Sequence, residues 1–251
     1  MNTIIMEGRV LPENRAVTIN NLESIRYRDP RGFEAVFDIK IEDSEIQIKC
    51  TGSTEINSLP EMSIVRAYEL VTSLVDLYAF SKGWALHVIL DNFTVNGVRQ
   101  GIALSQVSAA PFCTTISNEN DFHEIWELLL SNFELKFAFR DLISSLSTLN
   151  YSSIAASRAL DSIRKSIAPD GSTESESWRI LREKLQIERM YLQFITDSSR
   201  EPRHGNRGAA VGEDQLEVTH RIWKIMNRYI EYLKRGATEK LCQEEFPLLI
   251  K

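Results

Sequence analysis

Apolar and polar residues alternate along the first third of the chain. From residue 33 to residue 41 every odd position is apolar, and from 46 to 50 every even position is apolar. This period of two is typical of a strand with one face in water. The polar turn Glu42-Asp43-Ser44 separates the two runs, so residues 33–51 are predicted to form a β-hairpin. Short strands are also predicted before the hairpin, at 3–6 and 16–19.

A helical spacing of apolar residues follows the hairpin. Pro60 favours a helix start near Ser58 or Leu59, and Gly83 favours an end. Apolar residues recur between them at the positions that one face of a helix would bury. One long helix is therefore predicted over this stretch.

Strand patterns return after Gly83. Residues 84–91 are predicted to form a strand, Asn96-Gly97 is typical of a tight hairpin turn, and 102–104 are predicted to form a last strand. Residues 1–110 are therefore predicted to form an antiparallel β-sheet with one long helix packed across it.

From Ser117 the period becomes helical throughout. Residues 118–149 predict one long helix, or two with a bend near Asn132. A third helix is predicted from Ser152 or Ser153 to Ile167, and a fourth and a fifth follow, marked by apolar residues at 178–195 and 216–233. Helices of this length favour an antiparallel bundle over 116–251, with a linker at 105–115. The predicted fold class is α+β, with two domains.

Charge and cysteine content narrow the classes of protein. Residues 1–150 contain 12 Lys and Arg against 20 Asp and Glu, whereas residues 151–251 contain 17 against 15. A net charge of −6 lacks the basic surplus of a duplex-DNA binder. No apolar run approaches the roughly 18 residues of a bilayer crossing, and no signal peptide is evident. Three distant cysteines are typical of a reducing compartment, so a cytoplasmic protein without membrane contact is predicted.

Familiar chemical motifs are missing from the sequence. It contains no Gly-rich phosphate loop, no Cys-x-x-Cys and no His-Glu-x-x-His, and its four histidines are isolated. No metal site and no cofactor are predicted.

One basic stretch, residues 197–208, carries the candidate chemistry. It is predicted to be a loop between the fourth and fifth helices, and it contains Arg200, Arg203, His204, Gly205 and Arg207. Arginine offers planar, permanently charged donors suited to phosphate, and histidine can move a proton near neutral pH. A basic loop before a helix start would bind an anion with help from the helix N-terminus. The alternative is structural, in which Arg203 and His204 bond to neighbouring helices.

The third predicted helix offers partners for this loop. Arg158 and Asp161 share a helix face, and Arg164 lies about one turn further on. Arg158 and Asp161 would either form a solvated pair or face the Arg203–His204 stretch, where Asp161 would orient or neutralise it.

The stretch Arg200-Glu201-Pro202-Arg203-His204 in a helical domain resembles the HEPN superfamily, many of whose members are metal-independent ribonucleases. In that family an Arg and a His lie at or near the start of the last long helix. The resemblance implies that His204 acts as acid or base on a 2′-hydroxyl and that Arg200 stabilises the phosphate. Here only three residues separate Arg200 from His204, fewer than the family usually has. The pattern Arg158…Asp161…Trp178…Arg203-His204-Gly205 also resembles helical tails of bacterial proteins without assigned function.

Two functional hypotheses follow. The favoured one is a non-enzymatic binding or assembly module, which contacts an anionic ligand or partner such as RNA or a nucleotide and which self-associates as a homodimer through its amphipathic helices. The other is a HEPN-like ribonuclease that uses Arg200 and His204. Catalysis requires several convergent groups, and the sequence displays one histidine with undefined neighbours.

Overall fold

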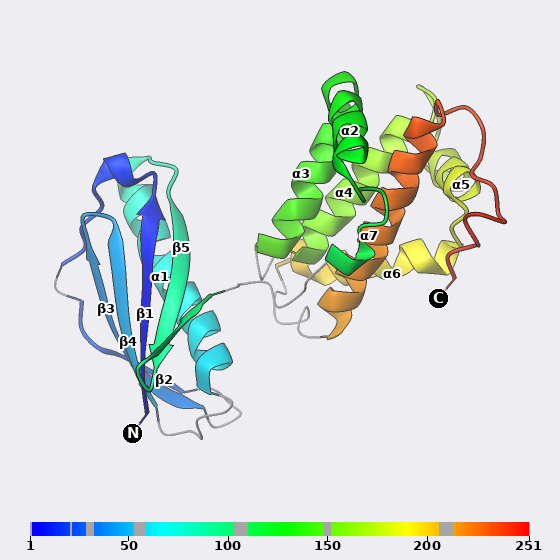
Figure 1. Cartoon of the computed structure of the whole chain (residues 1–251). Coiled ribbons are helices and arrows are strands. Elements are labelled where there is room, and N and C mark those ends of the chain that lie inside the picture. The colour runs from blue at the N-terminus through cyan, green and yellow to red at the C-terminus, as the bar shows by residue number, and fades with distance from the viewer. Residues whose placement is uncertain are drawn as a thin grey trace. The chain divides into compact units, whose positions relative to one another are not determined.

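The computed structural model describes residues 2–20, 22–28, 33–52, 59–102, 110–147, 152–205 and 213–250. The chain divides into two compact units, Met1–Ala103 and Leu104–Lys251 (Figure 1). The first unit is a sheet with one helix and the second is helical, so the predicted α+β class is confirmed.

The N-terminal unit contains a six-stranded sheet in the order β2-β3-β4-β1-β5-β6, with every neighbouring pair antiparallel. In chain order its elements are β1 Asn2–Leu11, β2 Ile25–Arg28, β3 Glu34–Glu42, β4 Glu45–Gly52, α1 Leu59–Lys82, β5 His87–Val95 and β6 Val98–Gly101. Helix α1 lies along one face of the sheet (Figure 1). Its residues Ala67, Val71 and Val75 are buried against the inward side chains of the strands. The predicted hairpin and helix are confirmed.

The central strand β1 contains a bulge at Gly8. The pairing of β1 with β5 shifts register between Glu7 and Gly8. A Cβ atom at Gly8 would lie 2.2 Å from the Ile89 carbonyl oxygen and 2.9 Å from the Leu90 Cα. Glycine is therefore required by the close approach of the two backbones.

Two strand predictions in this unit are wrong in detail. Residues 16–19 form an isolated bridge between Ile19 and Ile41 in place of a strand, because Ala16 has a left-handed backbone (φ +47°). The last strand is Val98–Gly101; Ile102 follows it, and residues 103 and 104 lie outside the described residues. The edge strand β2 has no counterpart among the predictions.

The C-terminal unit consists of six helices in the part of the chain that the structure describes. They are α2 Glu119–Ser131, α3 Phe133–Ser147, α4 Ser152–Ile167, α5 Glu174–Leu185, α6 Arg189–Arg203 and α7 Glu213–Lys234, preceded by a short 3₁₀ turn η2 at Ala110–Phe112. Helix α4 contacts α3, α5, α6 and α7, and buries Ala159, Leu160 and Ile163. The predicted break near Asn132 and the predicted third helix are confirmed.

The predicted fourth helix is two helices. Helix α5 ends at Leu185, its C-cap Gln186 takes a left-handed conformation (φ +54°), and α6 begins at Arg189. The apolar period continues across the break because Leu185, Ile187 and Leu192 all enter one core. Periodicity alone therefore hides the turn.

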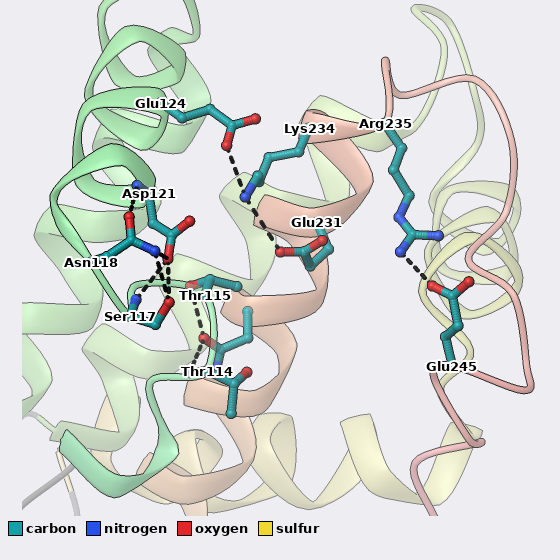
Figure 2. Close-up of polar contacts among 11 residues, drawn as sticks. Thr114, Thr115, Ser117, Asn118, Asp121, Glu124, Glu231, Lys234, Arg235 and Glu245 are labelled. Carbon is teal, nitrogen blue, oxygen red and sulfur yellow. Dashed lines mark hydrogen bonds and ion pairs between the residues drawn. The ribbon is translucent and has the colours of Figure 1, made fainter.

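Helix α7 holds the flanking segments through buried polar side chains. The Asn227 amide oxygen accepts hydrogen bonds from the Thr114 amide and the Thr115 hydroxyl, both at 3.1 Å (Figure 2). The Asn227 amide nitrogen donates to the Phe112 carbonyl. The Arg228 guanidinium donates to the carbonyls of Leu185, Gln186 and Pro247. Residues 112–115, within the predicted linker, are thus bonded to α7.

Ion pairs join the end of α7 to α2 and to the C-terminal segment. Lys234 pairs with Glu124 at 2.9 Å and Arg235 pairs with Glu245 at 2.5 Å (Figure 2). The bond with Glu124 raises the pKa of Lys234. Asn118 caps α2 by accepting from the amides of Asn120 and Asp121.

Candidate functional site

An open cavity of about 720 Å³ lies between α4, α5 and α6 of the C-terminal unit. We call it the α4–α6 cavity. Charged and polar residues dominate its lining, which consists of Ser157, Asp161, Arg164, Glu174, Ser175, Glu176, Trp178, Arg179, Arg182, Arg189, Leu192, Gln193, Thr196, Asp197 and Arg203. Five arginines and four acids are among them.

The helix ends fix the walls of this cavity. Helix α5 begins with a capping box, in which the Thr173 hydroxyl accepts from the Glu176 amide and the Glu176 carboxylate accepts from the Thr173 amide. These hydrogen bonds, led by the one from the Thr173 backbone, lower the pKa of Glu176. Glu176 is therefore committed to the cap and holds the first turn of α5 at the rim.

Arg164 is the most firmly held arginine of the lining. Its guanidinium donates to the Ser177 hydroxyl at 2.7 Å and to the Asp161 carboxylate at 3.2 Å, and it lies 4.7 Å from the centre of the Trp178 ring. Its side chain is 14% exposed, and its Nε has no hydrogen-bond partner among the described residues. Arg164 is therefore preorganised by α4 and α5.

Three other arginines present charge without a carboxylate partner among the described residues. Arg182 and Arg189 make no ion pair, and Arg203 donates to the Ser157 hydroxyl. Arg179, in contrast, pairs with Glu183 at 2.7 Å. Asp161 and Glu176 are engaged by Arg164 and the α5 cap. Of the other charged residues of the lining, Arg182, Arg189 and Arg203 on one side and Glu174 and Asp197 on the other make no ion pair among the described residues, which leaves an excess of one positive charge.

The start of α6 adds to this positive character. No side chain caps its first turn, that turn contains no acid, and Arg189 is its first residue. Leu192 and Gln193, one turn on, also line the cavity. A helix N-terminus carries partial positive charge, which adds to the charge of Arg189, while the N-cap residue beside it is the acidic Glu188.

Of the residues singled out in the sequence, Asp161, Arg164 and Arg203 line this cavity, whereas Arg158, Arg200, His204 and Gly205 do not. Arg203 from α6 and Asp161 from α4 both line it. Arg158 is not among the lining residues, and the solvated Arg158–Asp161 pair, one of the two alternatives drawn from the sequence, does not form. Arg158 instead pairs with Asp141 of α3 at 3.4 Å, where burial raises the pKa of Asp141, and Asp161 pairs with Arg164.

The predicted basic loop is largely helix. Residues 197–203 are the last two turns of α6, because Ile195, Ser199 and Pro202 continue its buried face. Arg200 lies in the last turn, and the amide of His204 donates to the carbonyls of Arg200 and Glu201 as the C-cap. Both side chains are exposed and neither belongs to the cavity lining. Their end of α6 carries the partial negative charge of the helix. The help expected from the N-terminus of the following helix stays a prediction, because residues 206–212 lie outside the described residues.

Gly205 makes the turn that follows α6. Its φ is +90°, a left-handed value that favours glycine. Arg207 lies outside the described residues. Arg182 and Arg189, which flank the break between α5 and α6, were not predicted from the sequence. The sequence feature that could have indicated them is two arginines seven residues apart, on either side of a turn that the continuous apolar period concealed.

Comparison with known proteins finds one family. The N-terminal domain model of a domain of unknown function, DUF8168, matches residues 4–102, and the C-terminal domain model of DUF8168 matches residues 122–234. The chain carries both domains of the DUF8168 family. No curated protein and no solved structure matches it. The cavity residues lie within the DUF8168 C-terminal domain, and the sheet forms the DUF8168 N-terminal domain.

Two features are absent from the described residues of the DUF8168 chain, a helix able to span a membrane and a cluster able to hold a metal ion. None of the described helices combines the length and apolar character that a bilayer crossing requires. Among the described residues, His, Cys, Asp and Glu side chains do not gather in groups that could hold a metal ion.

Proposed function

We propose that the helical unit binds an extended, phosphate-bearing anion in the α4–α6 cavity. The observation that carries the proposal is the set Arg182, Arg189 and Arg203, which line one cavity without carboxylate partners among the described residues. Arginine forks match phosphate geometry, and each charge-assisted hydrogen bond contributes about 1.5–3 kcal/mol. Arg164 lies in the same lining, but its ion pair with Asp161 balances its charge.

The spacing of the arginines selects the shape of the ligand. Arg189 and Arg203 stand at opposite ends of the 15-residue helix α6, so about 21 Å of helix axis separates their α-carbons at 1.5 Å per residue. A ligand that uses both ends must be long and carry several negative charges. A short single strand of RNA has this chemistry, and its binding would weaken as salt rises.

The test compares a single-stranded RNA oligonucleotide with inorganic phosphate by titration calorimetry. We expect the oligonucleotide to bind more tightly, and we expect Arg189→Ala and Arg203→Ala each to weaken it about tenfold or more. Arg179→Ala is the matched control, since Arg179 shares the lining but is paired with Glu183, and it should change affinity by less. Wild-type protein that binds neither probe at low salt contradicts the proposed function. Equal affinity for both probes contradicts the extended ligand.

A ribonuclease function through Arg200 and His204 is the second candidate. These residues lie four positions apart at the end of α6 and are both exposed, a spacing that brings two side chains onto one helix face. Incubation of the oligonucleotide with wild type and His204→Ala tests it. Cleavage that the substitution abolishes would support the enzyme, and intact RNA with wild type would remove it.

A further inference from the structure

Helices α2 and α3 present large apolar side chains to solvent. Phe122, Trp126 and Leu130 recur every four residues along α2, and Phe133 and Phe137 follow the same spacing on α3. They are 59%, 50%, 54%, 64% and 42% exposed, respectively. We call these five residues the outer apolar face. One residue, Asn132, joins the two helices.

The fold does not need these side chains for its own core. The inward positions of the same helices, Ile125, Leu135 and Leu142, are buried in the unit. An amphipathic helix normally exposes polar residues on the opposite side, and clustered aromatic exposure marks an interaction surface. Aromatic side chains are also the residues enriched at the centres of protein interfaces.

The charges beside the outer apolar face differ in sign between the two helices. Helix α2 contains four acids and neither Lys nor Arg; Glu119 and Glu127 are exposed without ion-pair partners among the described residues. On α3 the exposed charged side chains are Lys136 and Arg140, and the two acids of the helix, Glu134 and Asp141, are half-buried, Asp141 beside Arg158. The face therefore has one acidic border and one basic border.

We propose that a second copy of this chain covers the outer apolar face, with α2 of each copy against α3 of the other. A two-fold interface brings the same patch of both copies together. In that arrangement the acidic border of each copy lies against the basic border of the other copy. The patch is therefore electrostatically complementary to itself. A partner of uniform charge would match only half of it.

Sedimentation of the full chain across micromolar concentrations is the first measurement. We expect a dimer whose dissociation constant rises at least about tenfold with Trp126→Glu or Phe133→Glu. Circular dichroism should remain that of the wild type, because both side chains are largely outside the core. A wild type that stays monomeric overturns the proposal, whatever else covers the face.

Charge reversal separates a second copy from any other occupant. One variant carries Glu119→Lys and Glu127→Lys, and the other carries Lys136→Glu and Arg140→Glu. Each alone should be monomeric, because like borders then face each other in the homodimer. An equal mixture should dimerise, since the lysines of one variant face the glutamates of the other. A mixture that stays monomeric overturns the two-fold arrangement.

Discussion

Tyr191 illustrates how a single buried hydroxyl affects stability. The side chain is 4% exposed, its hydroxyl has no partner among the described residues, and burial raises its pKa to about 12. We expect Tyr191→Phe to leave the free energy of unfolding at neutral pH unchanged or to raise it by about 1 kcal/mol, because an unsatisfied group is removed. Tyr229→Phe is the contrast, since the Tyr229 hydroxyl bonds to Ser166 and its loss should destabilise. Urea unfolding measures both.

The same residue predicts a pH dependence. An unfolded tyrosine ionises near pH 10, whereas Tyr191 keeps its proton in the folded protein until about pH 12. Its contribution to stability is therefore complete below pH 10 and is lost as pH rises towards 12, a loss of at most roughly 3 kcal/mol. The Tyr191→Phe protein should lose less stability than wild type over this range. Parallel slopes for the two proteins would contradict the assignment to Tyr191.

Individual partners were the least predictable feature from sequence. Helical spacing allows Asp161 to pair with either Arg158 or Arg164, each three residues away, and tertiary neighbours decide between them. Asp141 of α3 draws Arg158 away, while Ser177 and Trp178 of α5 hold Arg164 beside Asp161. Those neighbours are distant along the chain, so no local pattern contains them.

At the scale of elements, the bulge of β1 offers a sharp test. Gly8→Ala places a methyl group within 2.2 Å of the Ile89 carbonyl oxygen, so backbone must move. We expect a loss of about 3 kcal/mol or more in the free energy of unfolding of the N-terminal unit. Gly101→Ala in β6 is the control, because no atom lies within 4 Å of its added Cβ. Thermal unfolding that gives equal stability for the two variants would contradict the packing account of Gly8.

The types of the elements could be predicted from the sequence, but the end of α6, which carries Arg203 of the cavity lining, could not. The alternation that predicts the hairpin and the period that predicts α1 and α4 are local and strong. The end of α6 is harder, because Ser199 and Pro202 occupy buried positions that are ordinarily apolar, and a polar, proline-containing run is typical of a loop. If Ser199 and Pro202 are counted with Ile195 as one buried face, the helical period continues to the end of α6.

At the scale of the whole molecule, the sequence predicted two halves of different character, but it did not predict the α4–α6 cavity. The cavity draws arginines from three helices, and its formation depends on the turn between α5 and α6. Tertiary packing determines which side chains from different helices meet in one cavity. A single sequence indicates that packing only through the period of its apolar residues. The outer apolar face was hidden for the same reason, since Trp126 and Phe133 follow the period of helices whose buried side is elsewhere.

Separate cores predict separate folding. One buried cluster comprises residues of 4–93 only and the other residues of 125–241 only. Fragments 1–103 and 104–251 should therefore each fold alone, and their circular dichroism spectra should sum to that of the full chain.

A third fragment tests how far the helical unit extends. Fragment 116–251 starts at the predicted domain boundary and lacks the carbonyl of Phe112, the amide of Thr114 and the hydroxyl of Thr115, which bond to Asn227. Asn227 is 8% exposed, so its amide would lose partners that water replaces poorly. We expect this fragment to be about 1–3 kcal/mol less stable than 104–251 in urea. Equal stability of the two fragments would mean that residues 112–115 are not part of the folded helical unit. As a control, Asn227→Ala in fragment 104–251 should cause the same loss of stability as removing residues 104–115.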